Sequence, residues 1–433
     1  MLDLDISGDD LIKALLTLSE SGVACILDSC GVSHLGSHLL IAGIAPTDTT
    51  FIAGLSAKET LDRFAELTAE SGLVSFFTIS YGIGLKIQGI RSDRPEPNEP
   101  DIFLARFDAL IVHDYDIGRT TLTGNPKRAE LLQIKPPDID NAPIEPCFAR
   151  SNMSKAEYLH AVEAIRENIR DGDTYQANLT HRLECRLPAT TSPQMIFSRL
   201  RSRHPAPFAA FFTRGDSAVV SGSPERFFRL TNSGRRITTS PIKGTRKRGA
   251  NDVEDTKLRQ ELTESGKDRA ENTMIVDLLR NDLGRICEFG SVAAEKLCDL
   301  EEHPSLFHLV STVSGRLRRD VGIADVLLAM FPCGSITGAP KISTMKIIDA
   351  TEPDPRGLSM GAIGYSLPDD SFGLPAGIDM SVAIRTMVVH GRTATFNVGG
   401  GIVIDSDPES EYLETLTKAA ALLDGLDARF VAD

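Results

Sequence analysis

The sequence predicts an α+β fold, in which strands and helices come in separate runs. The first observation is a series of four short strand-like runs between residues 208 and 240, followed by a cationic stretch and a carboxylate-rich helix. The second is a clear helix over residues 267–283. The third is a further group of strand-like runs between residues 362 and 404 that precedes a final helix. This order differs from a regular βαβ repeat and is typical of the α+β class.

Residues 1–134 are predicted to form an N-terminal domain of mixed strands and helices. Apolar residues follow helical spacing over residues 11–18 and 59–71. The predicted strands of this part are residues 23–27, 74–79, 107–113 and 120–123. Residues 135–150 are rich in proline and polar side chains, and they predict a linker.

Residues 151–433 are predicted to form the larger domain. Ser154 is a candidate N-cap for a helix that ends near residue 171, and Gly284 is expected just beyond the end of the 267–283 helix. The other predicted helices are residues 192–202, 321–330, 340–350 and 408–424. The predicted strands are residues 175–183, 208–213, 217–221, 226–230, 236–240, 310–317, 362–367, 380–389, 393–398 and 402–404.

Composition narrows the functional classes. The chain has 60 acidic and 46 basic residues and a net charge of -14 at pH 7, which disfavours nonspecific binding to nucleic acid or to an anionic membrane. No apolar run approaches the roughly 18 residues of a membrane-spanning helix, and the acidic N-terminus lacks the basic region of a signal peptide. The seven cysteines include no C-x-x-C pair, which favours reduced thiols and gives no zinc site. We therefore expect a cytoplasmic protein with no nucleic-acid or membrane partner.

A cationic stretch, PIKGTRKR at residues 241–248, contains the first candidate catalytic residue. Such a charge run can be a solvated basic turn. Alternatively, Pro241 and Gly244 fix a tight turn with an exposed amide next to Thr245. Lys243 lies inside that turn, and a lysine held near other cations can lose proton affinity and become a nucleophile.

Two predicted helices each carry a pair of carboxylates. Asp268 and Glu271 are three residues apart on the first, and Glu411 and Glu414 are three apart on the second, with Lys418 four residues further on. Either helix alone is consistent with a solvated amphipathic face. Together the two pairs can enclose one Mg²⁺, a hard cation that takes oxygen ligands. No His or Cys grouping competes for a softer metal.

Other features suggest recognition of an anion and proton transfer. The glycine triplet at 399–401 either lets backbone amides approach an anion or forms a tight β corner. Arg385 ends an apolar strand and is a candidate carboxylate clamp. Glu225 follows a strand and is a candidate general acid if it is partly buried, with a surface turn as the alternative. His308 lies among apolar residues, a setting more typical of a core histidine than of a catalyst.

The order of these motifs resembles that of the chorismate-binding enzymes, a family that includes component I of anthranilate synthase, component I of aminodeoxychorismate synthase, and the isochorismate and salicylate synthases. The resemblance covers about residues 150–425 and is weaker over residues 1–130. The matching stretches are GDTYQAN (172–178), SPERF (223–227), PIKGTR (241–246), AEN (270–272), VDLLRNDLG (276–284), HLVS (308–311), GAPK (338–341), IRT (384–386), GGGIV (399–403) and DPESEYLET (407–415).

The resemblance implies a fold of two large antiparallel sheets packed face to face with helices outside, and an active site between them. It implies that Glu271 and Glu411 ligate Mg²⁺ directly, and that Asp268 and Glu414 do so directly or through water. The metal would hold the ring carboxylate of chorismate.

The resemblance also implies roles around the substrate. Arg385 and the amides around Gly399 and Gly401 would bind the enolpyruvyl carboxylate, and Glu225 would protonate the departing 4-hydroxyl group. The remaining implied substrate-binding residues are Gly244, Thr245, His308 and Lys418.

The residues at two positions imply which reaction of the family this chain catalyses. Lys243 stands where anthranilate synthases usually have alanine, and it resembles the lysine of aminodeoxychorismate synthase component I, which attacks C2 of chorismate. Gln176 stands where isochorismate and salicylate synthases carry a lysine base. The implied function is therefore the Mg²⁺-dependent conversion of chorismate and ammonia to 4-amino-4-deoxychorismate, an amino-transferring step toward para-aminobenzoate and folate. Anthranilate synthase component I, a synthase of 2-amino-2-deoxyisochorismate and a non-catalytic chorismate-binding subunit are the alternatives.

The sequence also bears on the nitrogen source, and it departs from the family pattern at two places. No cysteine lies in the G-x-C-x-G context of a triad glutaminase, so we expect this chain to use ammonia, and glutamine only through a separate amidotransferase subunit, component II. Ser359 takes the place of a tyrosine that is common in relatives. Residues 26–29, ILDS, are only similar to the LLES stretch at a tryptophan site, which leaves binding of an amino acid there open.

Overall fold

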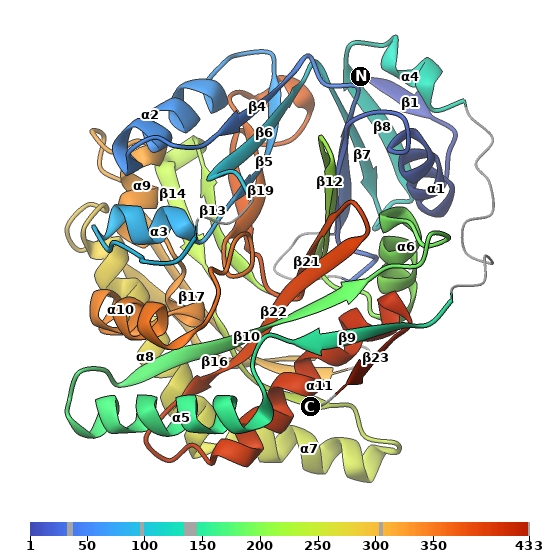
Figure 1. The fold of residues 1–433 in the computed structure, drawn as a ribbon. Helices are drawn as coiled ribbons and strands as arrows, with labels where there is room; N and C mark the ends of the chain where they lie inside the picture. Colours follow the sequence, from blue (N-terminus) through green and yellow to red (C-terminus); the bar gives the residue numbers. More distant parts are fainter. Residues whose placement is uncertain (33–37, 96–98, 134–144, 303–305, 432–433) are drawn as a thin grey trace.

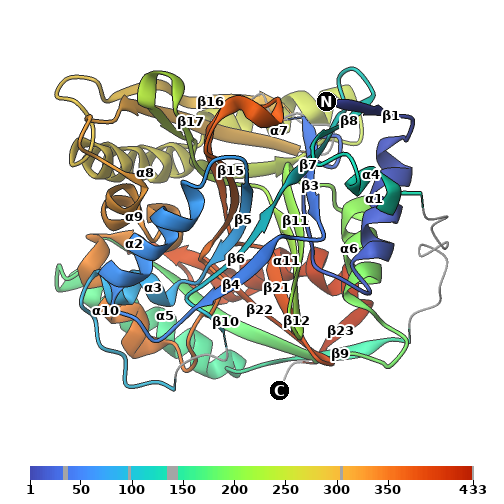
Figure 2. The same ribbon diagram turned by 90° about the horizontal axis from the view of Figure 1, so that it is seen from above.

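The computed structural model describes the chain except residues 33–37, 96–98, 134–144, 303–305 and 432–433. Two large β-sheets pack face to face, and helices cover their outer faces (Figures 1 and 2). The predicted α+β class and the predicted pair of antiparallel sheets are both confirmed. Most of the linker predicted at 135–150 lies outside the described residues.

The first sheet has 13 strands among the described residues. Its pairs are antiparallel except for β23 with β9. Its order is β1 (Leu2–Leu4), β8 (Arg119–Gly124), β7 (Ala109–Asp114), β3 (Leu39–Ile44), β2 (Ala24–Asp28), β11 (Phe208–Arg214), β12 (Ser217–Ser223), β21 (Thr386–His390), β22 (Thr393–Ile402), β10 (Gln176–Arg186), β9 (Cys147–Ser151) and β23 (Ala428–Val431), and β18 (Gly338–Ala339) also pairs with β10.

The second sheet has 10 strands in the described part of the chain, all paired antiparallel. Its order is β15 (Ile242–Lys247), β17 (Leu306–Arg316), β14 (Arg236–Thr239), β13 (Arg226–Thr231), β20 (Gly377–Val382), β19 (Ala362–Leu367), β5 (Val74–Ile79), β6 (Ile102–Phe107) and β4 (Asp48–Ile52), and β16 (Ala293–Glu302) also pairs with β17.

Strands from the first 134 residues belong to both sheets. In the first sheet β2 pairs with β11, and in the second β5 pairs with β19. An aromatic core lies between the sheets, where the rings of Phe76 on β5 and Phe212 on β11 meet edge to face at 6.1 Å. The two parts of the chain thus share their sheets and a core, and the boundaries at 134 and 150 stay predictions.

Helices close the outer faces with their apolar sides. On the first sheet these are α1 (Gly8–Leu18), α6 (Pro193–Arg203) and α11 (Pro408–Leu426), and on the second they are α2 (Ala57–Thr68), α8 (Gly266–Gly284) and α9 (Ile323–Met330). The other helices are α3 (Gly82–Ile87), α4 (Arg128–Leu131), α5 (Lys155–Arg170), α7 (Asp252–Glu264) and α10 (Lys341–Thr351), and short 3-10 turns are η1 (Ser233–Arg235), η2 (Gly334–Ile336) and η3 (Asp370–Phe372). No helix in the described residues is both long enough and apolar enough to span a membrane.

Local capping explains where two predicted helices begin. Ser154 forms a capping box with Glu157 at the start of α5, as expected from the sequence. Asp407 accepts a hydrogen bond from the backbone N–H of Ser410 and is followed by Pro408 in the first turn of α11. Gly284, predicted to lie beyond α8, is instead its last residue, because the right-handed backbone continues through Arg285.

Two of the crossovers, the points at which the chain passes from one sheet to the other, are neighbours in space. The first joins β12 to β13, and the second joins β20 to β21. The prediction of one strand over 380–389 is therefore wrong, because the backbone breaks at Arg385, where φ is 47°. Ser223 Oγ donates to Val382 O at 2.6 Å, Val382 N to Glu225 O at 3.0 Å, and Gly222 N to Arg385 O at 3.0 Å. These bonds tie the two crossovers together.

Two other local predictions are wrong. Residues 241–245 do not form a tight turn, because residues from Ile242 onward form the edge strand β15, paired with β17. The glycines at 399–401 form neither a corner nor a break before a new strand at 402–404, because they continue β22 and pair with β10. In both places the tertiary pairing overrides the turn preference of glycine and proline.

Candidate functional site

The candidate site forms around the two crossovers, with Glu225 on the first and Arg385 on the second. Glu225 is 5% exposed, and its Oε1 has no hydrogen-bond partner among the described residues. The surface-turn alternative for Glu225 is therefore wrong. Burial raises the pKa of the Glu225 carboxyl, and Ser335, Lys243 and Arg385 offset this only in part. A carboxyl that keeps its proton in this way is suited to act as an acid.

Arg385 is the second charged group at the crossovers. Burial lowers its pKa, and the neighbouring Glu225 opposes that shift. Its left-handed backbone, unusual for a residue other than glycine, is fixed by the bond from Gly222 N to its carbonyl. The crossover therefore holds a guanidinium next to a buried carboxyl at a defined place, which suits a clamp for a carboxylate.

A glycine bulge shapes the strand that carries Lys243. The register of β15 against β17 shifts between Lys243 and Thr245, and Gly244 has a φ of 79°. A Cβ atom at Gly244 would lie 3.0 Å from Asp268 Cγ and 2.8 Å from Leu262 Cδ1. Glycine at this position therefore lets β15 approach α8 closely.

The charge of Lys243 acts on the carboxyls of three other segments. Its ammonium group lowers the pKa of Glu225, of Glu271 on α8 and of Glu414 on α11. The solvated-turn alternative for this stretch does not describe such an environment. Next to Lys243 along the chain, Thr245 Oγ1 lies 2.9 Å from Nδ1 of His308, which is 6% exposed.

The four carboxylates predicted to bind a metal lie on α8 and α11, and some of them influence each other electrostatically across the two helices. Burial raises the pKa of Glu271 and Glu411, and the charge of Glu414 raises both further. Asp268 also raises the pKa of Glu271. The charge of Glu414 on α11 thus acts on Glu271 on α8, while the Glu414 side chain itself is half exposed.

Lysines balance this negative charge. Lys418 Nζ lies 2.7 Å from Glu414 Oε1 and donates to Gly399 O at 2.9 Å. Burial acts to raise the pKa of Glu414, but Lys418, Lys267 and Lys243 bring it below its ordinary value. Lys418 thereby links α11 to the glycine segment of β22.

The glycines of β22 make room for neighbouring polar groups. A Cβ atom at Gly401 would lie 2.1 Å from Gln176 Nε2, and one at Gly400 would lie 3.1 Å from Glu411 Oε2. Gly399 pairs with Thr180 in β10, with Leu179 O only 2.0 Å from its Cβ position. Glycine is needed here for close approach within a strand.

The chemistry of the carboxylates fits a hard dication such as Mg²⁺, whose charge would relieve the repulsion between them. In the described part of the chain, no three His, Cys, Asp or Glu side chains are gathered closely enough to hold a metal ion. Asp268 is instead engaged by Arg246, 3.0 Å away, and Glu414 by Lys418. The ligand assignment stays a prediction.

Four residues of the region were not among the predicted site residues. Ser335 lies beside Glu225, Gln176 covers Gly401, and Ser406 Oγ donates to Glu411 Oε1 at 2.6 Å. Lys267 is 3.9 Å from Glu271. Lys267 and Ser406 lie close in the sequence to the glutamate that each contacts, and Lys267 has the spacing of one helical turn before Glu271; Ser335 and Gln176 come from distant segments.

Ser359, which departs from the family pattern, has a structural contact. Its side chain is buried, and its Oγ accepts a hydrogen bond from Asn397 N on β22 at 3.2 Å. The hydroxyl therefore supports the strand that continues into the glycine segment.

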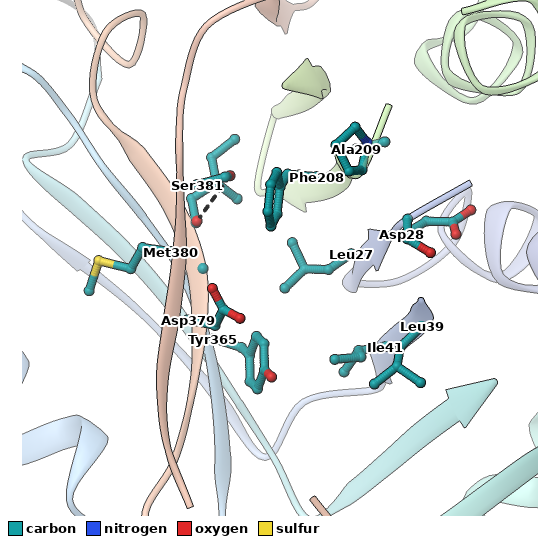
Figure 3. A pocket seen from close by; sticks show the side chains of 14 residues that line it. Leu27, Asp28, Leu39, Ile41, Phe208, Ala209, Tyr365, Asp379, Met380 and Ser381 are labelled. Atoms are coloured by element: carbon teal, nitrogen blue, oxygen red, sulfur yellow. Dashed lines mark hydrogen bonds between the residues drawn. The ribbon is translucent and has the colours of Figure 1, made fainter. Parts of the chain in front are cut away.

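A separate cavity lies between the sheets (Figure 3). It is lined from both sheets, by residues that include Leu27 and Asp28 on β2 and Asp379 on β20. Its volume of about 40 Å³ has room for a few water molecules. The Asp28 carboxylate is already engaged by Tyr115 Oη at 2.7 Å and Arg201 Nε at 2.7 Å. Its described lining contains none of the predicted site residues, so the candidate site is elsewhere.

Comparison with known proteins gives a match to the family model described as chorismate binding enzyme over residues 31–424. An aminodeoxychorismate synthase of Streptomyces griseus is 46% identical over 273 residues, which cover 63% of this chain and 36% of that protein. Anthranilate synthase component 1 1 of Haloarcula marismortui is 39% identical over 315 residues, covering 73% and 60%. Aminodeoxychorismate synthase component 1 of Bacillus subtilis is 36% identical over 344 residues, covering 76% and 71%. The match thus spans less than two thirds of the length of the first two relatives.

Solved structures share the whole architecture. Anthranilate synthase component I of Streptococcus pneumoniae is 27% identical with a TM-score of 0.74, covering 93% of this chain and 90% of that one. The menaquinone-specific isochorismate synthase of Escherichia coli has a TM-score of 0.75 at 16% identity, covering 98% and 94%. The second likeness is one of fold alone.

The buried Glu225 carboxyl predicts a pH-dependent stability. Because its pKa is raised in the folded state from the ordinary value of 4.5, the folded chain keeps a proton that the unfolded chain releases. Stability should therefore fall as pH rises above 4.5 and level off above the folded pKa. Glu225→Gln should match the wild type at lower pH and be more stable at neutral pH, by about 1.4 kcal/mol for each unit of pKa shift.

Thermal unfolding midpoints of both proteins, measured from about pH 4 to about pH 9, report this difference, because that interval spans the titration of a carboxyl with a raised pKa. Glu20→Gln, at an exposed position, controls for the loss of one negative charge. Equal stability of Glu225→Gln and wild type at every pH would show that the carboxyl is not protonated in the folded chain.

Proposed function

The chain belongs to the family of chorismate-binding enzymes, and on that basis we propose that it converts chorismate and ammonia to 4-amino-4-deoxychorismate. The observation that carries this proposal is the position of Lys243, which influences the Glu225 carboxyl and the carboxylates of α8 and α11 at once. A lysine at this point would attack the ring whose 4-hydroxyl group Glu225 would protonate. The names of two similar relatives, both aminodeoxychorismate synthases, support the same reaction.

In the proposed reaction, the neutral amine of Lys243 attacks C2 of chorismate. The ring double bonds shift, the C4–O bond breaks, and Glu225 gives its proton to the departing 4-hydroxyl group, which leaves as water. Ammonia then adds at C4, the double bonds shift back, and the Lys243 amine leaves C2. The net change replaces the 4-hydroxyl group by an amino group, and the enzyme is regenerated once Glu225 takes up a proton.

Chorismate carries two carboxylates, and the site offers cationic groups and amides for them. We assign Arg385 and the backbone amides near Gly399 and Gly401 to the enolpyruvyl carboxylate. The other proposed contacts are Gly244, Thr245, His308 and Lys418. Thr245 and His308 are joined across β15 and β17, and Lys418 is tied to Gly399 O, so these groups are held before the substrate arrives.

Anthranilate synthase is the second candidate function. It is favoured by the relative from Haloarcula marismortui, whose match covers 73% of this chain. Product identification separates the two functions. Purified chain is incubated with chorismate, Mg²⁺ and an ammonium salt, and the products are resolved by chromatography and mass spectrometry. The 4-amino product supports the proposal, and anthranilate with pyruvate supports the second candidate.

Replacing Lys243 tests the nucleophile. Lys243→Ala removes the amine but keeps Glu225 and Arg385, so residual turnover should persist while the 4-amino product falls by roughly 100-fold or more. Ammonia can then attack C2 directly, which shifts product toward the 2-amino isomer or anthranilate. Lys243→Arg should not rescue the reaction, because a guanidinium stays protonated.

Mass spectrometry of enzyme mixed with chorismate without ammonia should detect an adduct on Lys243. Unchanged 4-amino product in both variants, together with no adduct, would reduce Lys243 to an electrostatic contact.

We further propose a Mg²⁺ site in which Glu271 and Glu411 bind directly, and Asp268 and Glu414 bind directly or through water. When bound, the ion would hold the ring carboxylate of chorismate. The chain itself would contribute the carboxylates of α8 and α11, and it holds one of them, Glu411, through Ser406 Oγ.

Removing one ligand charge tests this site. Glu271→Gln and Glu411→Gln should weaken Mg²⁺ binding by roughly 10-fold or more, measured by calorimetry on the free chain, and should nearly abolish turnover at limiting Mg²⁺. Asp277→Asn, on the exposed face of α8, is the matched control. Wild-type Mg²⁺ affinity in both glutamine variants would refute the assignment.

Finally, we propose that a separate amidotransferase subunit delivers ammonia when glutamine is the nitrogen source. The isolated chain should use ammonium salts and not glutamine, because none of its cysteines lies in the motif of a triad glutaminase. Chorismate consumption is measured with each nitrogen source at equal concentration. Glutamine-dependent turnover by the isolated chain would contradict the proposal.

A further inference from the structure

A fully buried ion pair lies next to the candidate site. Arg356 and Glu352 flank the end of α10, and their side chains are 1% and 2% exposed. Arg356 Nε donates to Glu352 Oε2 at 2.9 Å, and Nη2 donates to Oε1 at 2.7 Å. The guanidinium also lies over the Tyr81 ring, 4.6 Å from its centroid. The pair is therefore rigid and shielded from water.

The pair joins two segments that are far apart in the sequence. Arg356 Nη1 donates to Ile336 O on η2 at 3.0 Å, and Nη2 donates to Asn178 O on β10 at 2.5 Å. Glu352 Oε1 accepts from the backbone N–H of Thr180 at 2.7 Å and from its hydroxyl at 2.8 Å. A planar guanidinium and a carboxylate thus fix η2 against β10 in both distance and direction.

Both of these segments lead to the site. Asn178 and Thr180 lie opposite Gly401 and Gly399 in the pairing of β10 with β22. On the other segment, Ile336 follows Ser335, which lies beside the Glu225 carboxyl. The pair therefore connects the position of the acid to the position of the glycine segment.

Burial of two charges is a poor way to gain stability, because the loss of hydration offsets most of their attraction. Apolar residues could fill this space, but they would leave the three backbone groups that the pair bonds without a partner. We propose that Arg356 and Glu352 are positioning residues that set Ser335 and Glu225 against the glycine segment of β22 in the chorismate reaction. This inference rests on the proposed function of Glu225 and Gly399–Gly401.

The test compares Arg356→Lys with Arg214→Lys. Arg214 is also 1% exposed and bonds Glu99 at 3.1 Å and Thr78 at 3.2 Å, and within the described part of the chain it bonds none of the site residues. Both variants should lose thermal stability to a similar extent. Arg356→Lys should also lower kcat for chorismate consumption by roughly 10- to 100-fold, the scale expected when reacting groups shift by about 1 Å. Arg214→Lys should keep kcat and KM within about twofold of the wild-type values, as expected for a substitution away from the reacting groups.

A second measurement, which does not require turnover, detects protonation of the Glu225 carboxyl directly. Infrared difference titration detects the carbonyl stretch of the protonated carboxyl, identified by its absence in Glu225→Gln. Lys243, Arg385 and the Cys333 thiol surround this carboxyl along with Ser335. If Arg356→Lys releases Ser335, an interaction that lowers the pKa of Glu225 is lost, so the midpoint should move to higher pH. In Arg214→Lys it should not move.

The double variant Arg356→Met with Glu352→Leu separates positioning from packing. It leaves no buried charge without a partner but removes every bond to β10 and η2, so we expect kcat to stay low. Wild-type kcat in either Arg356 variant, or an unmoved Glu225 titration in Arg356→Lys, would overturn the inference. The kcat is measured as chorismate consumption, which does not depend on which product forms. An unexpected product would therefore contradict the proposed function but leave this test valid.

Discussion

The structure depends on two neighbouring points where the chain changes sheets. At these crossovers Glu225 and Arg385 are brought together, although they are far apart in the sequence. The crossovers hold each other through backbone bonds such as Val382 N to Glu225 O, so neither can move alone. The same bonds satisfy polar groups that the break between strands would otherwise leave buried and unpaired. The acid and the arginine therefore have fixed positions because the two sheets must exchange strands there.

Charged side chains that disfavour folding lie around the two crossovers. A buried carboxyl at Glu225 and the facing carboxylates of α8 and α11 all have unfavourable surroundings for a negative charge, which lysines relieve only in part. Such groups persist when the rest of the fold overcomes their cost. The aromatic core between the sheets, with Phe76 against Phe212, supplies that support away from the site. The aromatic packing that supports the fold thus lies away from the candidate site in the same two-sheet frame.

Glycine has a specific use at the places where backbone and charged side chains meet. At Gly244 a left-handed bulge lets the edge strand approach Asp268, and at Gly400 and Gly401 the strand approaches Glu411 and Gln176. The two cases differ physically. The first needs an unusual backbone angle, whereas the second needs only the absence of a side chain in a regular strand.

The sequence by itself determined the fold class, the family and the identity of the candidate residues. Helical spacing located the carboxylate helices, and Asp407 with Pro408 located the start of α11, because capping and periodicity are local properties. Only the tertiary structure decided that the stretch around Lys243 is an edge strand, that Arg385 interrupts a predicted strand, and which partners surround Glu225. Strand pairing and burial depend on contacts between distant segments, and no local pattern encodes them. For that reason Ser335, which lies beside the acid, could not be found from its own neighbourhood in the sequence.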